Sequence, residues 1–145
     1  MSAKENKELV RRAGKELSEI GGDVAKARAW CSKYYAPTYV YHSLSGGDLN
    51  REQAEQYVIA MVTAFPDAYV ENDDLVAEGD KVVARYTMRA THKGSFHGIP
   101  ATGKHVTLKG MEMRRIVGGK SVENWDLMDS LGLMTQLGAI PAPKK

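Results

Sequence analysis

Residues 122–129 read Val122-Glu123-Asn124-Trp125-Asp126-Leu127-Met128-Asp129, and they place carboxylates on a segment that otherwise has the composition of a buried strand. Side chains alternate across a strand, so Asn124 and Asp126 share one face while Trp125 and Asp129 share the other. If the even-numbered face looks inward, Asp126 loses solvation and the pKa of its carboxyl rises. Such a group is suited to proton transfer near neutral pH.

The length and composition of the chain favour one globular domain over residues 1–145. A chain of 145 residues can bury about two-thirds of its unfolded surface in one core. The charged fraction of 26% and the net charge of +2 give no electrostatic case for binding nucleic acid. The basic pair Lys144 and Lys145 follows two prolines, so we expect residues 140–145 to form a solvated tail.

The cysteine content and the hydropathy of the chain favour the cytoplasm. The single cysteine, Cys31, cannot form an internal disulfide, and the first residues lack the apolar core of a secretory signal. No apolar run approaches the roughly 20 residues of a spanning helix, so we expect no membrane role. His92, His97 and His105 lack the spacing that brings metal ligands together, and we expect no metal site.

The first half of the chain has helical periodicity. Residues 5–20 repeat apolar side chains at helical spacing and are followed by a glycine pair. Asp23 is placed to cap a second helix that reaches Tyr34, and Asn50 to cap a third that ends near Phe65. A short strand is expected at 39–42, between the second and third helices.

The second half alternates with the period of strands. We expect strands near 68–77, 81–92, 104–117 and 121–129, with turns at Gly79 and at the glycine pair after the third of them. Helices that precede a run of strands indicate an α+β domain, in which helices cover one face of a curved antiparallel sheet.

Short motifs along nearly the whole chain resemble the SnoaL-like polyketide cyclases, often labelled ester cyclases. They are Tyr41-His42, Ala64-Phe65-Pro66-Asp67, Glu78-Gly79-Asp80-Lys81-Val82-Val83, Thr91-His92-Lys93-Gly94, Gly98-Ile99-Pro100-Ala101-Thr102-Gly103, Glu123-Asn124-Trp125-Asp126 and Gln136-Leu137-Gly138. Each motif alone is common, but the ordered set is specific. The resemblance implies the nuclear-transport-factor-like cone, an α+β barrel whose strongly bent sheet and N-terminal helices surround a deep apolar cavity.

The resemblance also implies an activity. Characterised members of the family close a ring by intramolecular aldol condensation, without metal or cofactor, and an aspartate acts as acid and base. Asp126 matches that aspartate, and Asp129 is the alternative because the family pattern carries an acid at both places. This chain has Asn124 where the family often has histidine, which puts the usual polar partner of the aspartate in question.

Two histidines are further candidates for the site. By strand parity, His92 joins the inward face, where its imidazole could exchange a proton or bind a substrate carbonyl. The alternative is a core histidine that is hydrogen-bonded to the backbone. His42 matches a family position and either binds substrate or anchors its loop. Asp129 either serves the site or caps the helix that follows it.

Several large side chains are candidates to line the cavity. Aromatic and methionine side chains give adaptable contact to a flat, hydrophobic and even polycyclic ligand. The residues selected for substrate binding are His42, Asn124, Tyr41, Tyr86, Met88, Trp125 and Asp129. The orientation of Glu112 is left open, because strand parity allows it to be either a second inward acid or an outward partner of Arg114.

We therefore expect a cofactor-independent enzyme, with Asp126 and His92 as catalytic residues and Asn124 beside them. The competing readings are a small-molecule binding module without chemistry, and an isomerase or hydrolase on the same fold. We also expect a homo-oligomer, a dimer or a tetramer, because one face of the sheet needs cover.

Overall fold

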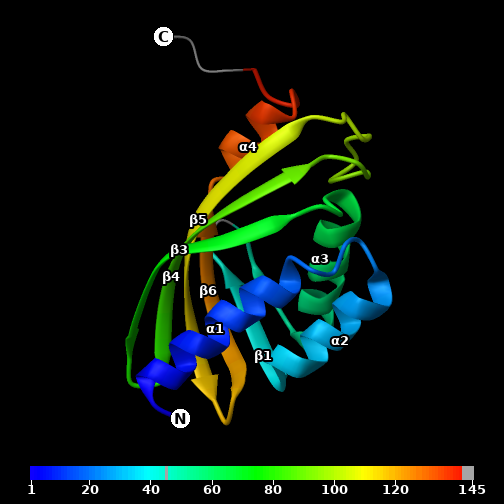
Figure 1. Ribbon diagram of the computed structural model, residues 1–145. Coiled ribbons are helices and arrows are strands. Elements are labelled where there is room, and N and C mark those ends of the chain that lie inside the picture. Colours follow the sequence, from blue (N-terminus) through cyan, green and yellow to red (C-terminus); the bar gives the residue numbers. More distant parts are fainter. Residues whose placement is uncertain (45, 142–145) are drawn as a thin grey trace.

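The computed structural model describes residues 1–44 and 46–141, and Figure 1 shows helices packed on one side of a bent sheet. In chain order the elements are α1 (Ala3–Leu17), α2 (Val24–Tyr34), β1 (Tyr35–Ser43), β2 (Asp48–Leu49), α3 (Arg51–Ala64), β3 (Tyr69–Glu78), β4 (Lys81–Thr91), β5 (His105–Val117), β6 (Lys120–Met128) and α4 (Ser130–Gln136). The α+β class predicted from the sequence is confirmed. Of the expected tail, Ile140 and Pro141 are exposed, and 142–145 lie outside the described residues.

Side-chain caps fix where the first three helices begin. Asp23 accepts a hydrogen bond from the Lys26 amide at α2, as predicted, and Asn50 forms a reciprocal capping box at α3. Helix α1 begins earlier than the predicted residue 5. The reason is a capping box that sequence reasoning missed, in which the Ser2 hydroxyl accepts from the Glu5 amide and the Glu5 carboxylate accepts from the Ser2 amide.

The sheet has the order β2-β1-β6-β5-β4-β3. Strands β3 to β6 form the predicted antiparallel meander, but β1 pairs in parallel with β6. Strand β1 is also longer than the predicted 39–42, because it begins directly after α2 with Tyr35 opposite Ser121. Since β2 and β3 lie at the edges, the described part of the sheet is open and does not close on itself as a barrel.

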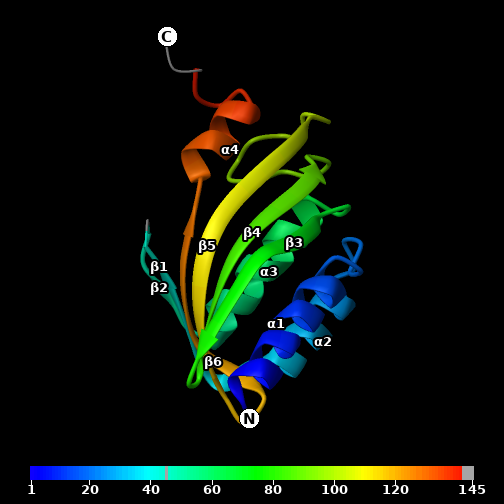
Figure 2. The ribbon, with the colours of Figure 1, turned by 60° about the vertical axis from the view of Figure 1, so that its left-hand side comes forward.

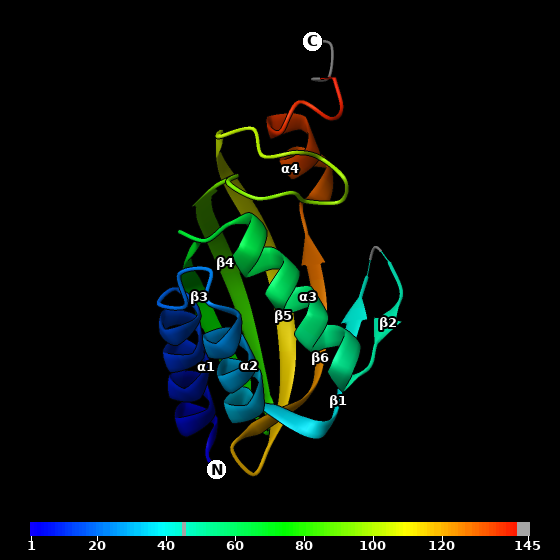
Figure 3. The ribbon, with the colours of Figure 1, turned by 90° about the vertical axis from the view of Figure 1, so that its right-hand side faces the viewer.

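The two faces of the sheet have different neighbours. Helices α1, α2 and α3 lie against the concave face, and no helix of the described residues covers the convex face of β3, β4 and β5 (Figure 2). The loop from β4 to β5 lies beside α4 at one end of the sheet (Figure 3), and its Lys93 and Gly94 amides donate to the carbonyl of Ala64 at the end of α3. No helix in the described ranges is long and apolar enough to cross a membrane.

Candidate active site

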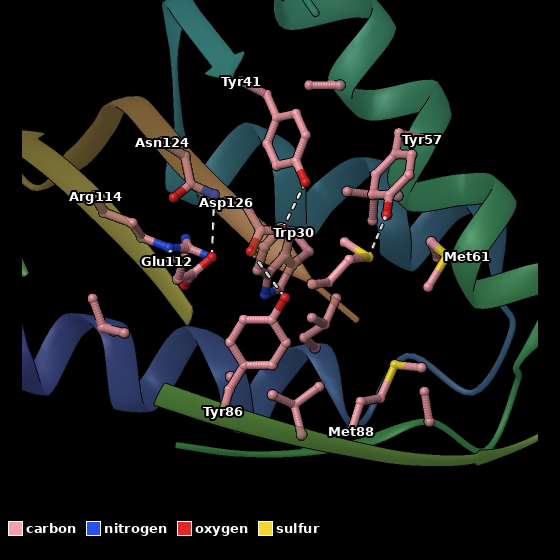
Figure 4. A pocket seen from close by; sticks show the side chains of 18 of the residues that line it. Trp30, Tyr41, Tyr57, Met61, Tyr86, Met88, Glu112, Arg114, Asn124 and Asp126 are labelled. Atoms are coloured by element: carbon pink, nitrogen blue, oxygen red, sulfur yellow. Dashed lines mark hydrogen bonds and ion pairs between the residues drawn. The ribbon is translucent and has the colours of Figure 1, made fainter. Parts of the chain in front are cut away.

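A cavity of about 160 Å³ lies between the concave face of the sheet and the three helices. Its walls are largely apolar, with Leu17 from α1, Trp30 from α2, Met61 from α3 and Met88 from β4. The polar side chains gather on β5 and β6, on the opposite side of the cavity from Met61 (Figure 4). The cavity thus combines an apolar body with one polar wall, which is the usual composition of a small-molecule site.

Asp126 is a polar group of this wall whose two carboxylate oxygens both accept hydrogen bonds. Its side chain projects from β6 into the cavity, and the residue is 6% exposed. The Tyr41 hydroxyl from β1 donates to Oδ2 at 2.6 Å, and the Tyr86 hydroxyl from β4 donates to Oδ1 at 2.9 Å (Figure 4). Two donors from different strands therefore fix the orientation of the carboxyl group.

Gly110 explains how Tyr86 reaches Asp126 across the intervening strand β5. Gly110 lies directly opposite Tyr86 on one side and Met128 on the other. A Cβ atom at this position would lie 2.4 Å from the Tyr86 hydroxyl oxygen and 2.9 Å from the Leu127 carbonyl oxygen. The missing side chain therefore leaves the space through which the phenol ring passes.

A buried ion pair continues the polar wall along β5. Arg114 Nε donates to Glu112 Oε1 at 2.7 Å, and Asn124 Nδ2 donates to Glu112 Oε2 at 3.1 Å. Glu112 lies opposite Asp126 in the strand register, and Arg114 lies opposite Asn124. The question left open by parity is settled, because Glu112 and Arg114 both face inward and pair with each other.

The environment of Asp126 favours its protonated form more than water does. Burial is the main cause that raises the pKa of the Asp126 carboxyl to about 6, and the negative charge of Glu112 adds to it. The tyrosine hydroxyls and the Arg114 guanidinium act in the opposite direction because they stabilise the carboxylate. A carboxyl with this pKa has both protonation states populated near neutral pH, which a group that takes and returns a proton requires.

Tyr57 supplies a hydroxyl that is only weakly engaged. It projects from α3 beside the Tyr41 ring, with ring centroids 5.7 Å apart, and donates to the Met128 sulfur at 3.6 Å. Burial raises the pKa of Tyr57, so the phenol stays protonated. Because a thioether is a weak acceptor, a ligand oxygen in the cavity would compete well for this donor.

His92 has the inward parity that the sequence indicated, but it is not among the cavity-lining residues. Its Nδ1 accepts from the Thr102 amide at 3.2 Å and lies 3.0 Å from the Thr102 hydroxyl, while its ring packs against Phe65. Strand β4 extends past the cavity before it reaches this residue. His92 therefore anchors the loop between β4 and β5, close to the core role weighed as its alternative.

His42 and Trp125 lie on the outer side of the sheet. Their rings stack at 5.2 Å, and His42 bridges Glu123 at 2.9 Å and Asp48 at 3.0 Å. Neither ring lines the cavity, because β1 and β6 turn their alternate residues, Tyr41 and Asp126, inward. The prediction that His42 and Trp125 contact a substrate inside the cavity is therefore wrong.

Asp129 and Cys31 have structural roles outside the cavity lining. Asp129 is exposed and caps α4, and its Oδ1 accepts a hydrogen bond from the Gly132 amide at 2.9 Å. Cys31 is fully buried, and burial raises the pKa of its thiol to about 12, which confirms it as an unreactive packing residue. Within residues 1–44 and 46–141, no three metal-binding side chains come together.

A family model, SnoaL-like polyketide cyclase, matches residues 22–137. This chain belongs to the SnoaL-like polyketide cyclase family. The matched range contains every polar residue of the cavity wall.

Two curated proteins share 33% identity with this family member over 72 residues. They are the aklanonic acid methyl ester cyclases DnrD of Streptomyces peucetius and DauD of Streptomyces sp. strain C5. Each match covers 50% of this chain, and it covers 50% of DnrD and 45% of DauD. The chain thus aligns with about half the length of these relatives.

Solved structures of similar proteins share the architecture over nearly the whole chain. AclR of Streptomyces galilaeus, titled as a candidate hydroxylase, is 30% identical with a TM-score of 0.81 over 99% of this chain and 87% of its own. A protein from Acidithiobacillus ferrooxidans, titled as a candidate polyketide cyclase, is 30% identical with a TM-score of 0.76 over 96% and 99%. The fold is therefore that of the SnoaL-like proteins.

Three residues in or beside this SnoaL-like cavity were missed or undervalued in the sequence. Arg114 was considered only as an outward partner, although its position two residues after Glu112 puts both on one face. Gly110 interrupts a strand pattern, and such a glycine signals a close approach by another group. The weak hydrogen bond of the Tyr57 hydroxyl to the Met128 sulfur depends on where α3 packs, which the sequence does not show.

Proposed function

We propose that this SnoaL-like protein is a cofactor-independent cyclase that closes a ring in a small carbonyl or ester substrate by intramolecular aldol condensation. The observation that carries the proposal is Asp126, a buried carboxyl in the cavity whose pKa is raised to about 6. The names of the curated relatives, which are ester cyclases, support the same reaction class.

In the proposed reaction, the Asp126 carboxylate takes a proton from the carbon next to a substrate carbonyl, which gives an enolate and a neutral carboxylic acid. The enolate carbon then attacks a second carbonyl of the same molecule, forming the carbon–carbon bond and an alkoxide. Asp126 returns its proton to that alkoxide. The enzyme ends in its starting protonation state, and the apolar walls hold the reacting carbons together away from bulk water.

Tyr57 is the donor that best fits the carbonyl oxygen. His92, expected from the sequence to bind the carbonyl, lies outside the cavity lining, and Asn124 donates one of its two amide hydrogens to Glu112. A neutral phenol that donates to a thioether sulfur can turn to the oxygen on which negative charge develops. Asn124 and the ion pair instead hold the polar wall in place.

The proposal is tested by proton exchange, which does not require the natural substrate. The protein is incubated in deuterated water with cyclohexanone, and loss of the α-proton signal is followed by NMR. We expect Asp126→Asn to lower the catalysed rate by about 10²–10⁴-fold. Asp129→Asn is the matched control, because asparagine is also a good helix cap. An Asp126→Asn protein that exchanges at the wild-type rate would exclude the acid/base role.

We also propose that the convex face of the sheet pairs with a second copy. Met111 and Leu127 lie opposite each other on β5 and β6 and are 54% and 52% exposed, and Val76 on β3 is 66% exposed. Light scattering during gel filtration tests this pairing, with Leu127→Lys expected to reduce the oligomer to a monomer. A monomeric wild-type protein would refute it. A cytoplasmic location stays a prediction.

A further inference from the structure

The geometry points to a substrate whose enclosed part is a single six-membered ring with small oxygen substituents, not a fused polycycle. This inference concerns the same cavity and rests on the proposed function only in assigning the cavity to the substrate. It replaces the polycyclic ligand considered from the sequence. Three observations support it, namely the size of the cavity, the fixed position of its walls and the placement of its polar groups.

The size of the cavity matches one ring. Its volume is about 160 Å³. An apolar cavity of about 150 Å³ in a protein core is filled by benzene. Pockets for larger organic ligands measure about 300–1,000 Å³. The cavity here is therefore about half the size of the smallest of these, and a second fused ring would have to displace side chains.

The side chains that form the walls are held by specific contacts, so moving them costs free energy. Trp30 Nε1 donates to the Ala13 carbonyl at 2.9 Å, which fixes the indole between α2 and α1. The phenols of Tyr41 and Tyr86 are fixed by their hydrogen bonds to Asp126. The remaining wall is formed by strands that are hydrogen-bonded to their neighbours in the sheet. Insertion of extra volume into packed surroundings of this kind is destabilising.

The charged side chains that line the cavity all lie on β5 and β6, and this arrangement sets the orientation of the ring. Asp126 and Glu112 face the cavity from β6 and β5, while Leu17, Met61 and Met88 form apolar surface elsewhere. A ring with an oxygen substituent can place that edge toward Asp126 and its other edge against the methionines. A ring without a polar substituent would give no partner to the two buried atoms of this wall that have none, Arg114 Nη1 and Asn124 Oδ1, at a cost in binding free energy.

A series of hydroxyarenes tests the size limit directly. Phenol, 2-naphthol and 2-anthrol each carry one hydroxyl and differ in ring number. Binding is followed through the methyl signals of ¹³C-labelled methionine, because Met61, Met88 and Met128 line the cavity and Met111 is exposed on the convex face. We expect phenol to shift the cavity signals without shifting that of Met111, and 2-anthrol to bind at least about tenfold more weakly.

A cavity-enlarging variant sharpens the test. Met88→Ala is expected to improve the affinity for 2-naphthol by about tenfold, because truncation of a buried side chain leaves space that a ligand can fill. Met111→Ala removes the same side chain outside the cavity and should leave the affinity for 2-naphthol unchanged. Val58→Ala, which also lines the cavity, is the substitute variant if Met88→Ala does not fold.

The inference is overturned if 2-anthrol shifts the three cavity methionines with an affinity equal to or greater than that of phenol. It is also overturned if phenol shifts Met111 and leaves the cavity signals unchanged. Both results concern binding and need no turnover. They are therefore separate from the proton-exchange result, which judges the role of Asp126 whatever the ring size.

Discussion

The two faces of β6 carry similar residues in opposite environments. On the inner face, Asp126 lies beside the ion pair of Glu112 and Arg114, and its pKa is raised because it is buried. On the outer face, hydrogen bonds from Arg115 and then from His42 lower the pKa of Glu123. The same strand thus holds one carboxyl ready to bind a proton and another kept ionised, because burial raises the pKa of the first and cationic partners lower the pKa of the second.

The largest expected effect comes from breaking the ion pair on the inner face. Glu112→Gln leaves the Arg114 charge buried without its counter-ion, and we expect the free energy of unfolding to fall by about 3 kcal/mol. It should also lower the pKa of Asp126, because the neighbouring negative charge is gone. Urea denaturation measures the first effect.

Glu123→Gln is the matched change on the outer face, and it should leave the unfolding free energy nearly unchanged because the pair there is accessible to water. Equal losses from both variants would remove the distinction between the faces.

The second prediction concerns the pH dependence of stability. Because the folded pKa of Asp126 lies above its unfolded value of about 4, its contribution is complete below pH 4 and is lost as the pH rises through 6. The loss is on the order of 3 kcal/mol for a shift of this size.

Unfolding of wild type and Asp126→Asn by urea at several pH values isolates this contribution. Wild type should lose stability relative to the variant between pH 4 and pH 7. A constant difference across that range would show that Asp126 titrates normally.

The third prediction addresses how the inner face is assembled. Gly110→Ala places a methyl group against the Tyr86 hydroxyl and the Leu127 carbonyl, so we expect a loss of about 1–3 kcal/mol and a displaced Tyr86. Gly47→Ala is the control, since no atom lies within 4 Å of the added Cβ there. Thermal unfolding compares the two, and equal melting temperatures would contradict the packing described for Tyr86.

The smallest effect is expected on the outer face. Hydrogen bonds that His42 donates to the carboxylates of Glu123 and Asp48 raise its pKa, so the stability it contributes is present below the unfolded pKa and is lost as the pH rises through the folded one. An NMR titration of the imidazole should show its pKa fall in Glu123→Gln and stay the same in Glu112→Gln. If the pKa of His42 changes in both variants, the two faces interact electrostatically and the distinction between them is lost.

The sequence predicted the parts of this molecule that depend on local pattern. Alternation along 122–129 placed Asp126 inward, and the side chains of Asp23 and Asn50 marked the starts of α2 and α3. Parity also put Trp125 on the face opposite to Asp126, so its selection as a substrate contact conflicted with the pattern itself.

The remaining features depend on contacts between distant segments. The parallel pairing of β1 with β6 joins residues about 85 positions apart, as the bond between Tyr41 and Asp126 shows. The cross-strand register that sets Glu112 opposite Asp126 is likewise invisible in one strand. His92 was misjudged because parity gives the face of a strand but not how far along it the cavity extends.

The most direct measurement is a ¹³C NMR titration of the Asp126 carboxyl in the wild-type protein. A pKa of about 6 is expected if burial on the inner face makes this group an acid and base near neutral pH. A pKa near the ordinary aspartate value of about 4 would contradict the account, because the carboxyl would then be ionised like Glu123 on the outer face.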